Sequence, residues 1–252
     1  MVNPLIYEDH LARGKAHPNR YDFLPDPVSA ISEMTKLEAR KTLGLPVDGK
    51  YVGCIGMMDK RKAIPELLAA FVNVGFPRDV RLLLAGRLDP AYAQLLDDKY
   101  AEYVREERIV ILNRDLTENE LRCGYTALDL HAVLQYRRFN LSANALKCVA
   151  FARPFICDNV GFTAMIAKRF SAGITCVIDD TKSVQSALRQ GLAKDLPELQ
   201  TRASRSLIEY HSNDNFARVA LNSVMGSSAA NVLGHTYRWN YAYSPVADLQ
   251  AA

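Results

Sequence analysis

The chain has 252 residues, enough for one large α/β domain or one ordinary domain with a small appendage, so its length argues against a two-domain enzyme with a full second core. Hydrophobic residues make up 49% of the sequence and charged residues 23%, a balance that excludes general disorder. The formal net charge of +3 comes from 31 basic and 28 acidic residues, so overall charge indicates no nucleic-acid partner.

Leader, membrane and metal signals are missing from the sequence. No stretch approaches the roughly 20 apolar residues of a membrane span, and the opening MVNPLIYEDH lacks the basic start and apolar run of a signal peptide, so we expect a cytoplasmic protein. The cysteines are odd in number, widely spaced and mostly inside apolar runs, which predicts reduced core thiols at Cys54, Cys123, Cys148, Cys157 and Cys176. The histidines form no HExxH pair and no cluster with cysteine, so no metal site is predicted.

The first part of the chain, residues 1–45, is predicted to be a linker or strap that ends in a short helix. The segment HPNRYDFLPDPVSA carries three prolines and no sustained periodicity. Residues 35–43 have a helical pattern, which Gly44 and Pro46 terminate.

Residues 46–226 alternate short apolar runs with longer amphipathic segments. Strands are predicted for the runs at 51–57, 80–86, 108–113, 128–134, 153–158 and 173–179. Helices are predicted after them, the clearest at 64–74, 91–107, 118–127, 143–152, 163–170 and 183–193. This order predicts an α/β fold with a doubly wound, mostly parallel, six-stranded Rossmann-like sheet covered on both faces. Extra terminal helices are predicted at 196–210 and 213–225, followed by an aromatic tail at 227–252.

The loop after the first predicted strand carries candidate ligand-binding residues, because an open parallel sheet binds ligands outside the carboxyl ends of its strands. Gly56 ends the strand, and Arg61 and Lys62 precede a helix with Pro65 in its first turn. The free amides of a helix amino terminus beside such cations can hold a phosphate. Solvated charge near a helix start explains the segment equally well.

The loop after the fourth predicted strand places Arg137 and Arg138 before Asn140, Ser142 and Asn144, ahead of an apolar helix. Ser142 or Asn144 is a good amino-terminal cap, and exposed amides together with the two arginines can engage a diphosphate. Capping alone explains the serine and the asparagines at least as well.

Other familiar site patterns are missing or are better explained by structure. Gly161, after the fifth predicted strand, permits close backbone approach, although a turn needs it in any case. No GxGxxG follows the first strand and no GxxxxGK[ST] or GxSxG occurs, which argues against simple dehydrogenase, kinase, NTPase and α/β-hydrolase functions. His131 lies inside an apolar run and is expected to be a satisfied core residue rather than a catalytic base.

Four segments have an informative order and spacing: LGLPVDGKYVGCIGMMDKRKAIPELLAAF, DVRLLLAGR, RIVILNRDLTENELRCGYTALDLHAVL and ARPFICDNVGF. Together they resemble the carboxy-terminal donor-binding domain of retaining glycosyltransferases with the GT-B fold, of the group 1 or family 4 type. The resemblance covers residues 40–195 and implies that the sheet is one half of a GT-B fold.

The resemblance implies a set of donor-binding positions, of which this chain keeps some. A lysine and an arginine hold the nucleotide diphosphate in the family; Lys62 matches the lysine, whereas Met57 stands at the arginine position. Two glutamates contact the donor sugar and the nucleotide ribose in the family; here Phe139, or its neighbour Arg138, and Lys147 stand in their places. The domain is therefore degenerate in its glutamate pair, and Lys147 either meets a phosphate or lies on the solvated helix face.

The resemblance implies binding of a nucleotide-diphosphate sugar and transfer, or help in transfer, of the sugar to an acceptor. The predicted donor-binding residues are Gly56, Arg61, Lys62, Arg138, Asn140, Ser142, Asn144 and Lys147. Protein cations and amides would stabilise the leaving diphosphate, so neither metal nor cofactor is required. The alternative is a catalytically degenerate scaffold or subunit domain that pairs with a separate acceptor-binding chain. The sequence leaves open whether the domain is active and whether the chain is a fragment or a complete protein.

Overall fold

A computed structural model describes residues 9–10, 12–15, 24–28, 34–136, 142–193 and 202–225. Two predicted site residues, Arg138 and Asn140, lie outside the described residues, as does the aromatic tail predicted at 227–252. No helix in the described part of the chain is long and apolar enough to cross a membrane.

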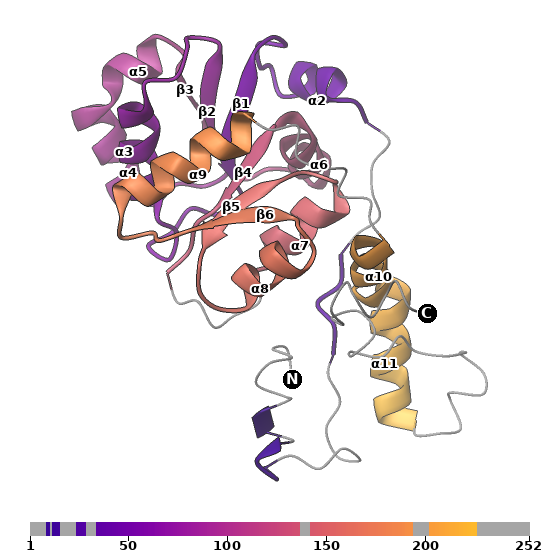
Figure 1. Cartoon of the computed structure of the whole chain (residues 1–252). Helices are drawn as coiled ribbons and strands as arrows, with labels where there is room; N and C mark the ends of the chain where they lie inside the picture. The colour runs from indigo at the N-terminus through magenta and orange to yellow at the C-terminus, as the bar shows by residue number, and fades with distance from the viewer. Residues whose placement is uncertain are drawn as a thin grey trace.

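A six-stranded parallel sheet forms the centre of the molecule (Figure 1). Its order is β3-β2-β1-β4-β5-β6, so the chain winds outward in one direction from β1 and in the other direction from β4. The strands are β1 (Lys50–Ile55), β2 (Val80–Ala85), β3 (Ile109–Leu112), β4 (Leu130–Val133), β5 (Phe155–Asp158) and β6 (Gly173–Cys176). Every neighbouring pair is parallel, which confirms the predicted doubly wound fold.

Helices cover both faces of the sheet and bury two separate apolar cores. One face carries α2 (Lys36–Thr42), α6 (Glu118–Ala127), α7 (Ala143–Ala150) and α8 (Phe162–Arg169). The other carries α3 (Ile64–Val74), α4 (Pro90–Lys99), α5 (Ala101–Arg105) and α9 (Thr181–Ala193). Successive residues of a strand point to opposite faces, so Tyr51 and Ile55 enter the first core while Val52 and Cys54 enter the second. Because both faces of each strand are buried, the strand sequences are continuous apolar runs.

The single helix predicted over 91–107 is wrong, because the chain forms two helices there. Tyr100 ends α4 and precedes α5 with φ −125° and ψ 12°, outside helical geometry. After this bend α5 contacts β3, and Tyr100, Tyr103 and Val104 pack against the core of that face. Tertiary packing therefore interrupts a segment whose residues favour one continuous helix.

The segment before α2 is tied to the two terminal helices, α10 (Arg202–Tyr210) and α11 (Asn213–Met225). Val28 forms a parallel bridge with Ser212, and its N–H donates to the His211 carbonyl at 2.8 Å. The His211 Nδ1 is 2.9 Å from the Asp26 carbonyl oxygen, to which it donates. α10 contacts α7, whereas α11 leads away from the sheet (Figure 1).

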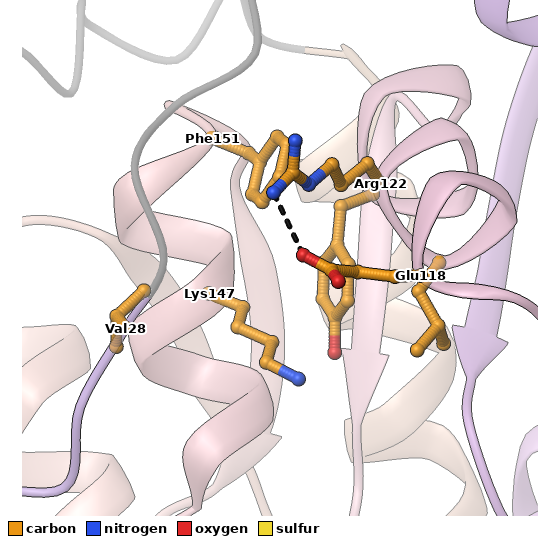
Figure 2. Close-up of a pocket in the computed structure, with 7 residues that line it drawn as sticks. Val28, Glu118, Arg122, Lys147 and Phe151 are labelled. Carbon is orange, nitrogen blue, oxygen red and sulfur yellow. Dashed lines mark hydrogen bonds and ion pairs between the residues drawn. The ribbon is translucent and has the colours of Figure 1, made fainter. Parts of the chain in front are cut away.

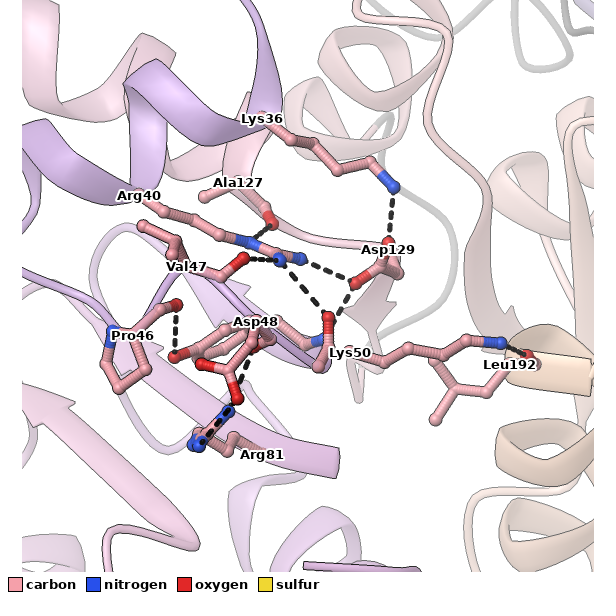
Figure 3. Close-up of polar contacts among 12 residues, drawn as sticks. Lys36, Arg40, Pro46, Val47, Asp48, Lys50, Arg81, Ala127, Asp129 and Leu192 are labelled. Carbon is pink, nitrogen blue, oxygen red and sulfur yellow. Dashed lines mark hydrogen bonds and ion pairs between the residues drawn. The ribbon is translucent and has the colours of Figure 1, made fainter. Parts of the chain in front are cut away.

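A buried ion cluster holds the edge of the sheet where β1 and β4 begin (Figure 3). The Arg40 guanidinium donates to Asp129 Oδ2 at 2.8 Å, and Lys36 pairs with the other carboxylate oxygen. Arg40 also donates to the carbonyls of Ala127, Val47 and Gly49. The N–H of Tyr51 donates to Asp129 Oδ2 at 2.8 Å, which joins α2 to the start of β1. These charges lie at the edge opposite the carboxyl ends and satisfy one another, so they are structural.

Candidate functional site

Three helix amino termini at the carboxyl edge of the sheet have no side-chain cap. Helices α3, α7 and α8 follow β1, β4 and β5, and their N-cap residues Ala63, Ser142 and Gly161 make no side-chain hydrogen bond to the first turn. Helices α4 and α6, which follow the outer strands β2 and β3, are capped by Asp89 and Thr117. Free N–H groups and the positive ends of three helix dipoles therefore gather at the middle of the sheet, where an anion is stabilised.

The prediction that Ser142 or Asn144 caps α7 is wrong, since neither side chain bonds to the first turn. Ser142 is buried at the N-cap position without a cap hydrogen bond. The Asn144 Nδ2 donates instead to the Ile55 carbonyl at 3.1 Å, and its Oδ1 accepts from the Tyr125 hydroxyl at 2.9 Å. The pairing of β1 with β4 brings α7 over the end of β1, so Asn144 positions α7 against that strand.

Gly56 leaves open space beside the backbone where β1 ends. Its φ is +93°, a conformation that other residues rarely adopt, and a Cβ built on it would meet no atom within 4 Å. Gly86 occupies the corresponding place after β2, but a Cβ there would lie 2.2 Å from the Gly56 carbonyl oxygen. The close approach of these two loops therefore requires Gly86, while the free side of Gly56 is accessible to a ligand.

The loop after β1 is joined to the loop after β4 by backbone hydrogen bonds. Lys62 forms an antiparallel bridge with Gln135, and the Tyr136 N–H donates to the Arg61 carbonyl at 2.8 Å. The Tyr92 hydroxyl donates to the Lys62 carbonyl at 3.0 Å. Lys62 is therefore held at the point where the strand order reverses, which is the usual ligand position of an open α/β sheet.

The Lys62 side chain is a buried cation that forms no ion pair with a described residue, although the Asp59 carboxylate, whose pKa Arg61 lowers most, also lies within range of its charge. Only 8% of the residue is exposed, and its ammonium has no hydrogen bond or ion pair with any residue that the structure describes. Burial raises the pKa of the Cys54 and Cys148 thiols, and the Lys62 ammonium opposes both shifts, which places it between β1 and α7. Burying an unpaired charge costs roughly several kcal/mol. An anion that paired with the Lys62 ammonium would offset that cost.

Arg61, the neighbouring predicted cation, is already engaged. Its guanidinium donates to Asp59 Oδ2 at 2.6 Å, and its backbone N–H donates to Asp59 Oδ1 at 2.9 Å. The hydrogen bonds from Arg61 lower the pKa of the Asp59 carboxyl. A ligand contact from Arg61 stays a prediction, and it would require sharing or breaking this ion pair.

Lys147 lies on α7 beside a hollow of about 360 Å³, measured with its open mouth, between α6, α7 and the segment at Val28 (Figure 2). The lining residues are Val28, Glu118, Leu121, Arg122, Tyr125, Lys147 and Phe151. The Lys147 side chain extends from α7 toward α6, and its Nζ lies 5.8 Å from the centre of the Tyr125 ring. Glu118 and Arg122 form an ion pair of 2.7 Å on the α6 side.

No protein-family model and no curated protein matches this sequence, but solved structures match its fold. The C-terminal domain of a glycosyl transferase group 1 family protein from Francisella tularensis matches with a TM-score of 0.56 and 17% identity, over 68% of this chain and 90% of that domain. A glycosyltransferase from Rickettsia africae matches with a TM-score of 0.69 and 13% identity, over 93% of this chain and 63% of the other. Anabaena HepE, solved in complex with UDP and glucose, matches with a TM-score of 0.66 and 11% identity, over 90% and 62%. The fold is that of a GT-B glycosyltransferase half.

Two of these matches give the share of a GT-B protein's length that this chain covers. The chain spans 63% of the length of the Rickettsia protein and 62% of that of HepE. It covers nearly all of the isolated Francisella C-terminal domain. The predicted resemblance is thereby confirmed as a match in fold to the C-terminal half of GT-B glycosyltransferases.

This GT-B half departs from the expected cation pattern at Met57. The residue follows Gly56, where the resemblance implies an arginine, and it is 61% exposed. Arg61 is paired with Asp59. Among the described residues of the loop after β1, Lys62 is therefore the buried cation that could contact a ligand.

The other conspicuous candidates for chemistry are core residues. His131 is buried, its Nε2 is 3.0 Å from the Tyr125 carbonyl oxygen, and burial lowers its pKa to about 4, which confirms the predicted structural role. All five cysteines are free and buried, as predicted. Among the described residues, no group of three His, Cys, Asp or Glu side chains is placed to hold a metal ion.

Sequence reasoning missed two residues that shape this edge, Tyr125 and Gln135. Tyr125 is buried in the last turns of α6, and its hydroxyl fixes Asn144. Gln135 follows β4 and pairs with Lys62 through its backbone. Neither carries a sequence signal of its own, because a core tyrosine and a loop glutamine are common, and their roles arise from the β1–β4 pairing.

Proposed function

We propose that this GT-B half binds a nucleotide-diphosphate sugar and takes part in transferring the sugar to an acceptor. The main supporting observation is the buried Lys62 ammonium, which forms no hydrogen bond or ion pair with a described residue, lies where the strand order reverses, and has near it the Asp59 carboxylate, which is already paired with Arg61. A diphosphate would supply the missing negative charge. The uncapped starts of α3 and α7 add N–H donors on either side.

The chemical role of these groups would be to stabilise charge on the leaving diphosphate. When the bond between the sugar and the diphosphate breaks, negative charge grows on the phosphate oxygens, and preorganised donors lower the barrier to that step. Lys62 would supply a fixed charge, and Gly56 would allow backbone approach. Ser142 and Asn144 would line the part of the site next to α7. Arg138 and Asn140 are included because they lie in the same loop of the sequence. The proposal requires no metal ion or cofactor.

HepE was solved in complex with UDP and glucose, which makes UDP-glucose a sensible first probe. That observation belongs to HepE, and at 11% identity it does not carry over the base or the sugar. The acceptor would be bound by a separate domain or chain, since this chain spans 62–63% of the length of two matched GT-B proteins.

Isothermal titration of the full chain with UDP-, GDP- and ADP-glucose tests the proposal. We expect one of the three to bind, and Lys62→Met to weaken that binding by about 10- to 100-fold, the ~1.5–3 kcal/mol of a hydrogen bond to a charged group. Lys60→Met is the matched control, because Lys60 is an exposed lysine of the same loop. It should leave the affinity unchanged.

Urea unfolding of the same two variants separates a binding role from a structural one. Methionine fills a similar volume without a charge, so Lys62→Met should leave the free energy of unfolding unchanged or raise it. Unaltered affinity in Lys62→Met, or no binding of any sugar nucleotide, would count against the proposed site.

A scaffold function without turnover is the second candidate, and the surface of α11 favours it. Leu221, Val224 and Met225 are exposed there, with Val224 at 85% exposure. Sedimentation of the full chain measures self-association through this surface, and Val224→Ser should weaken it. A monomer that binds a sugar nucleotide would leave this alternative without support.

A further inference from the structure

The hollow between α6 and α7 contains a second cation without a counter-charge. Lys147 is half-buried, and no described residue accepts a hydrogen bond from its ammonium or forms an ion pair with it. The Lys147 ammonium lies over the Tyr125 ring, and the centre of that ring is 5.8 Å from Nζ. A cation–π contact holds the ammonium in place and leaves its N–H donors available to a ligand.

The other groups that line the hollow leave this charge uncompensated. Glu118 and Arg122 are the remaining charged members, and they neutralise each other through their 2.7 Å ion pair. The rest of the lining is apolar or aromatic: Val28, Leu121, Tyr125 and Phe151. The hollow therefore carries a net charge of about +1 beside apolar surface, where an electrostatic contact is stronger than in open water.

The hollow shares a wall with the proposed diphosphate site. Tyr125 forms part of the hollow, and its hydroxyl donates to Asn144 at 2.9 Å. Asn144 in turn donates to the carbonyl of Ile55, the residue before Gly56. Lys147 follows Asn144 by three residues, so both side chains lie on one face of α7. Asn144 and Tyr125 thus connect the hollow to the end of β1, and the inference requires one ligand to reach both Lys62 and Lys147.

We propose that Lys147 is a specificity-determining residue that binds a second anionic group of the donor, in addition to the diphosphate. The proposal rests on the proposed function, because it assigns the same ligand a further contact. The group that would pair with Lys147 is a carboxylate or a phosphate. A sugar nucleotide can carry such a group in two places: a carboxylate on the sugar or a phosphate on the ribose. A neutral hexose on an unmodified nucleotide would leave the ammonium unpaired.

Two matched ligand pairs distinguish these sources in titrations of the full chain. UDP-glucuronate against UDP-glucose changes only the sugar, and uridine 3′,5′-bisphosphate against uridine 5′-monophosphate changes only the ribose. We expect the acidic member of one pair to bind about tenfold more tightly, as for a hydrogen bond to a charged group. Lys147→Gln should abolish that preference, and Lys147→Glu should reverse it because like charges repel.

Lys168→Gln on α8 is the control, since it removes the same charge from an exposed position outside the hollow. Thermal unfolding of each variant identifies any that fails to fold, and the conservative Lys147→Arg should keep the preference. Equal affinities within both pairs in the unmodified chain would overturn the inference, as would a preference that survives in Lys147→Gln. Lys62→Met should weaken both members of a pair alike. If GDP- or ADP-glucose binds in place of UDP-glucose, both pairs are made with that base. If no sugar nucleotide binds, the inference falls together with the proposed function, whereas equal binding within pairs leaves that function standing.

Discussion

At the residue scale, the same kind of side chain has opposite consequences at the two edges of the sheet. Arg40 at the amino edge is buried with a carboxylate and three carbonyls, so its charge is satisfied. Lys62 at the carboxyl edge is buried to a similar degree and has no such partner among the described residues. This difference is why we regard Arg40 as structural and propose Lys62 as the cation that binds an anion.

His131 makes stability depend on pH in a predictable direction. Burial lowers the pKa of the folded-state imidazole to about 4, below its unfolded value of 6.5. The unfolded chain therefore binds more protons between these values, so this contribution to stability is complete above pH 6.5 and declines as the pH falls toward 4. The full difference corresponds to about 3 kcal/mol.

The measurement is urea unfolding at several pH values between 6.5 and 4. His131→Phe, which cannot be protonated, should show a shallower loss of stability across that window than the unmodified chain. His211, whose pKa burial also lowers to about 4, stays in place in both proteins and serves as the internal reference. Identical slopes would mean that His131 is not held neutral by burial.

At the element scale, apolar packing holds the body of α7, whereas one asparagine and one tyrosine hold its amino-terminal end. Asn144 links the first turn of α7 to Ile55 and Tyr125, so the helix start is held against the end of β1 rather than capped by its own side chains. The Ser142 hydroxyl makes no cap hydrogen bond to the first turn of α7, whereas the Ser142 carbonyl accepts from the N–H groups of Ala145 and Leu146. The sequence pattern predicted the helix, but it could not distinguish a cap from a tether.

Tyr125→Phe removes the hydroxyl that donates to Asn144. We expect a loss of about 1 kcal/mol in the free energy of unfolding, the usual contribution of one hydrogen bond, and weaker sugar-nucleotide binding because α7 is less firmly positioned. Tyr51→Phe is the matched control, since its hydroxyl donates to the Pro46 carbonyl at 3.1 Å on the opposite edge. It should cost similar stability and leave binding unchanged. Equal binding by both variants would show that the tether does not matter for the ligand.

At the scale of the whole molecule, our proposal places ligand binding at the edge of the sheet opposite the ion cluster of Arg40, Lys36 and Asp129. The amino edge is closed by the cluster of Arg40, Lys36 and Asp129, whereas the carboxyl edge has helices without side-chain caps and a lysine, Lys62, that pairs with none of the described residues. This division follows from parallel strands, because all carboxyl ends meet at one edge and the loops there are free to vary.

Arg40→Met tests that division. Removing one partner of a buried ion pair costs about 3 kcal/mol or more, because Asp129 keeps its charge and several carbonyls lose their donor. We expect a large fall in the urea midpoint and an unchanged affinity for sugar nucleotides in the fraction that remains folded. Asp48→Asn provides a control at the same edge, because that aspartate is exposed and its contact with Arg81 is a long one of 4.0 Å. A binding defect in Arg40→Met at full folding would contradict the separation of the two edges.

The sequence by itself determined the strand and helix order, the sheet class and the burial of the cysteines and His131. These features depend on apolar periodicity and on local start and stop signals such as Pro65 in the first turn of α3 and Gly44 after α2, which act within a few residues. The break at Tyr100, the tether at Asn144, the neutralisation of Arg61 and the isolation of Lys62 and Lys147 were decided only by the tertiary structure. Each of these depends on which distant side chain lies within a few ångströms, and the pairing of β1 with β4, strands far apart in the sequence, sets those distances. A sequence shows that a residue is a cation, but it does not show whether a carboxylate lies beside that residue in the fold.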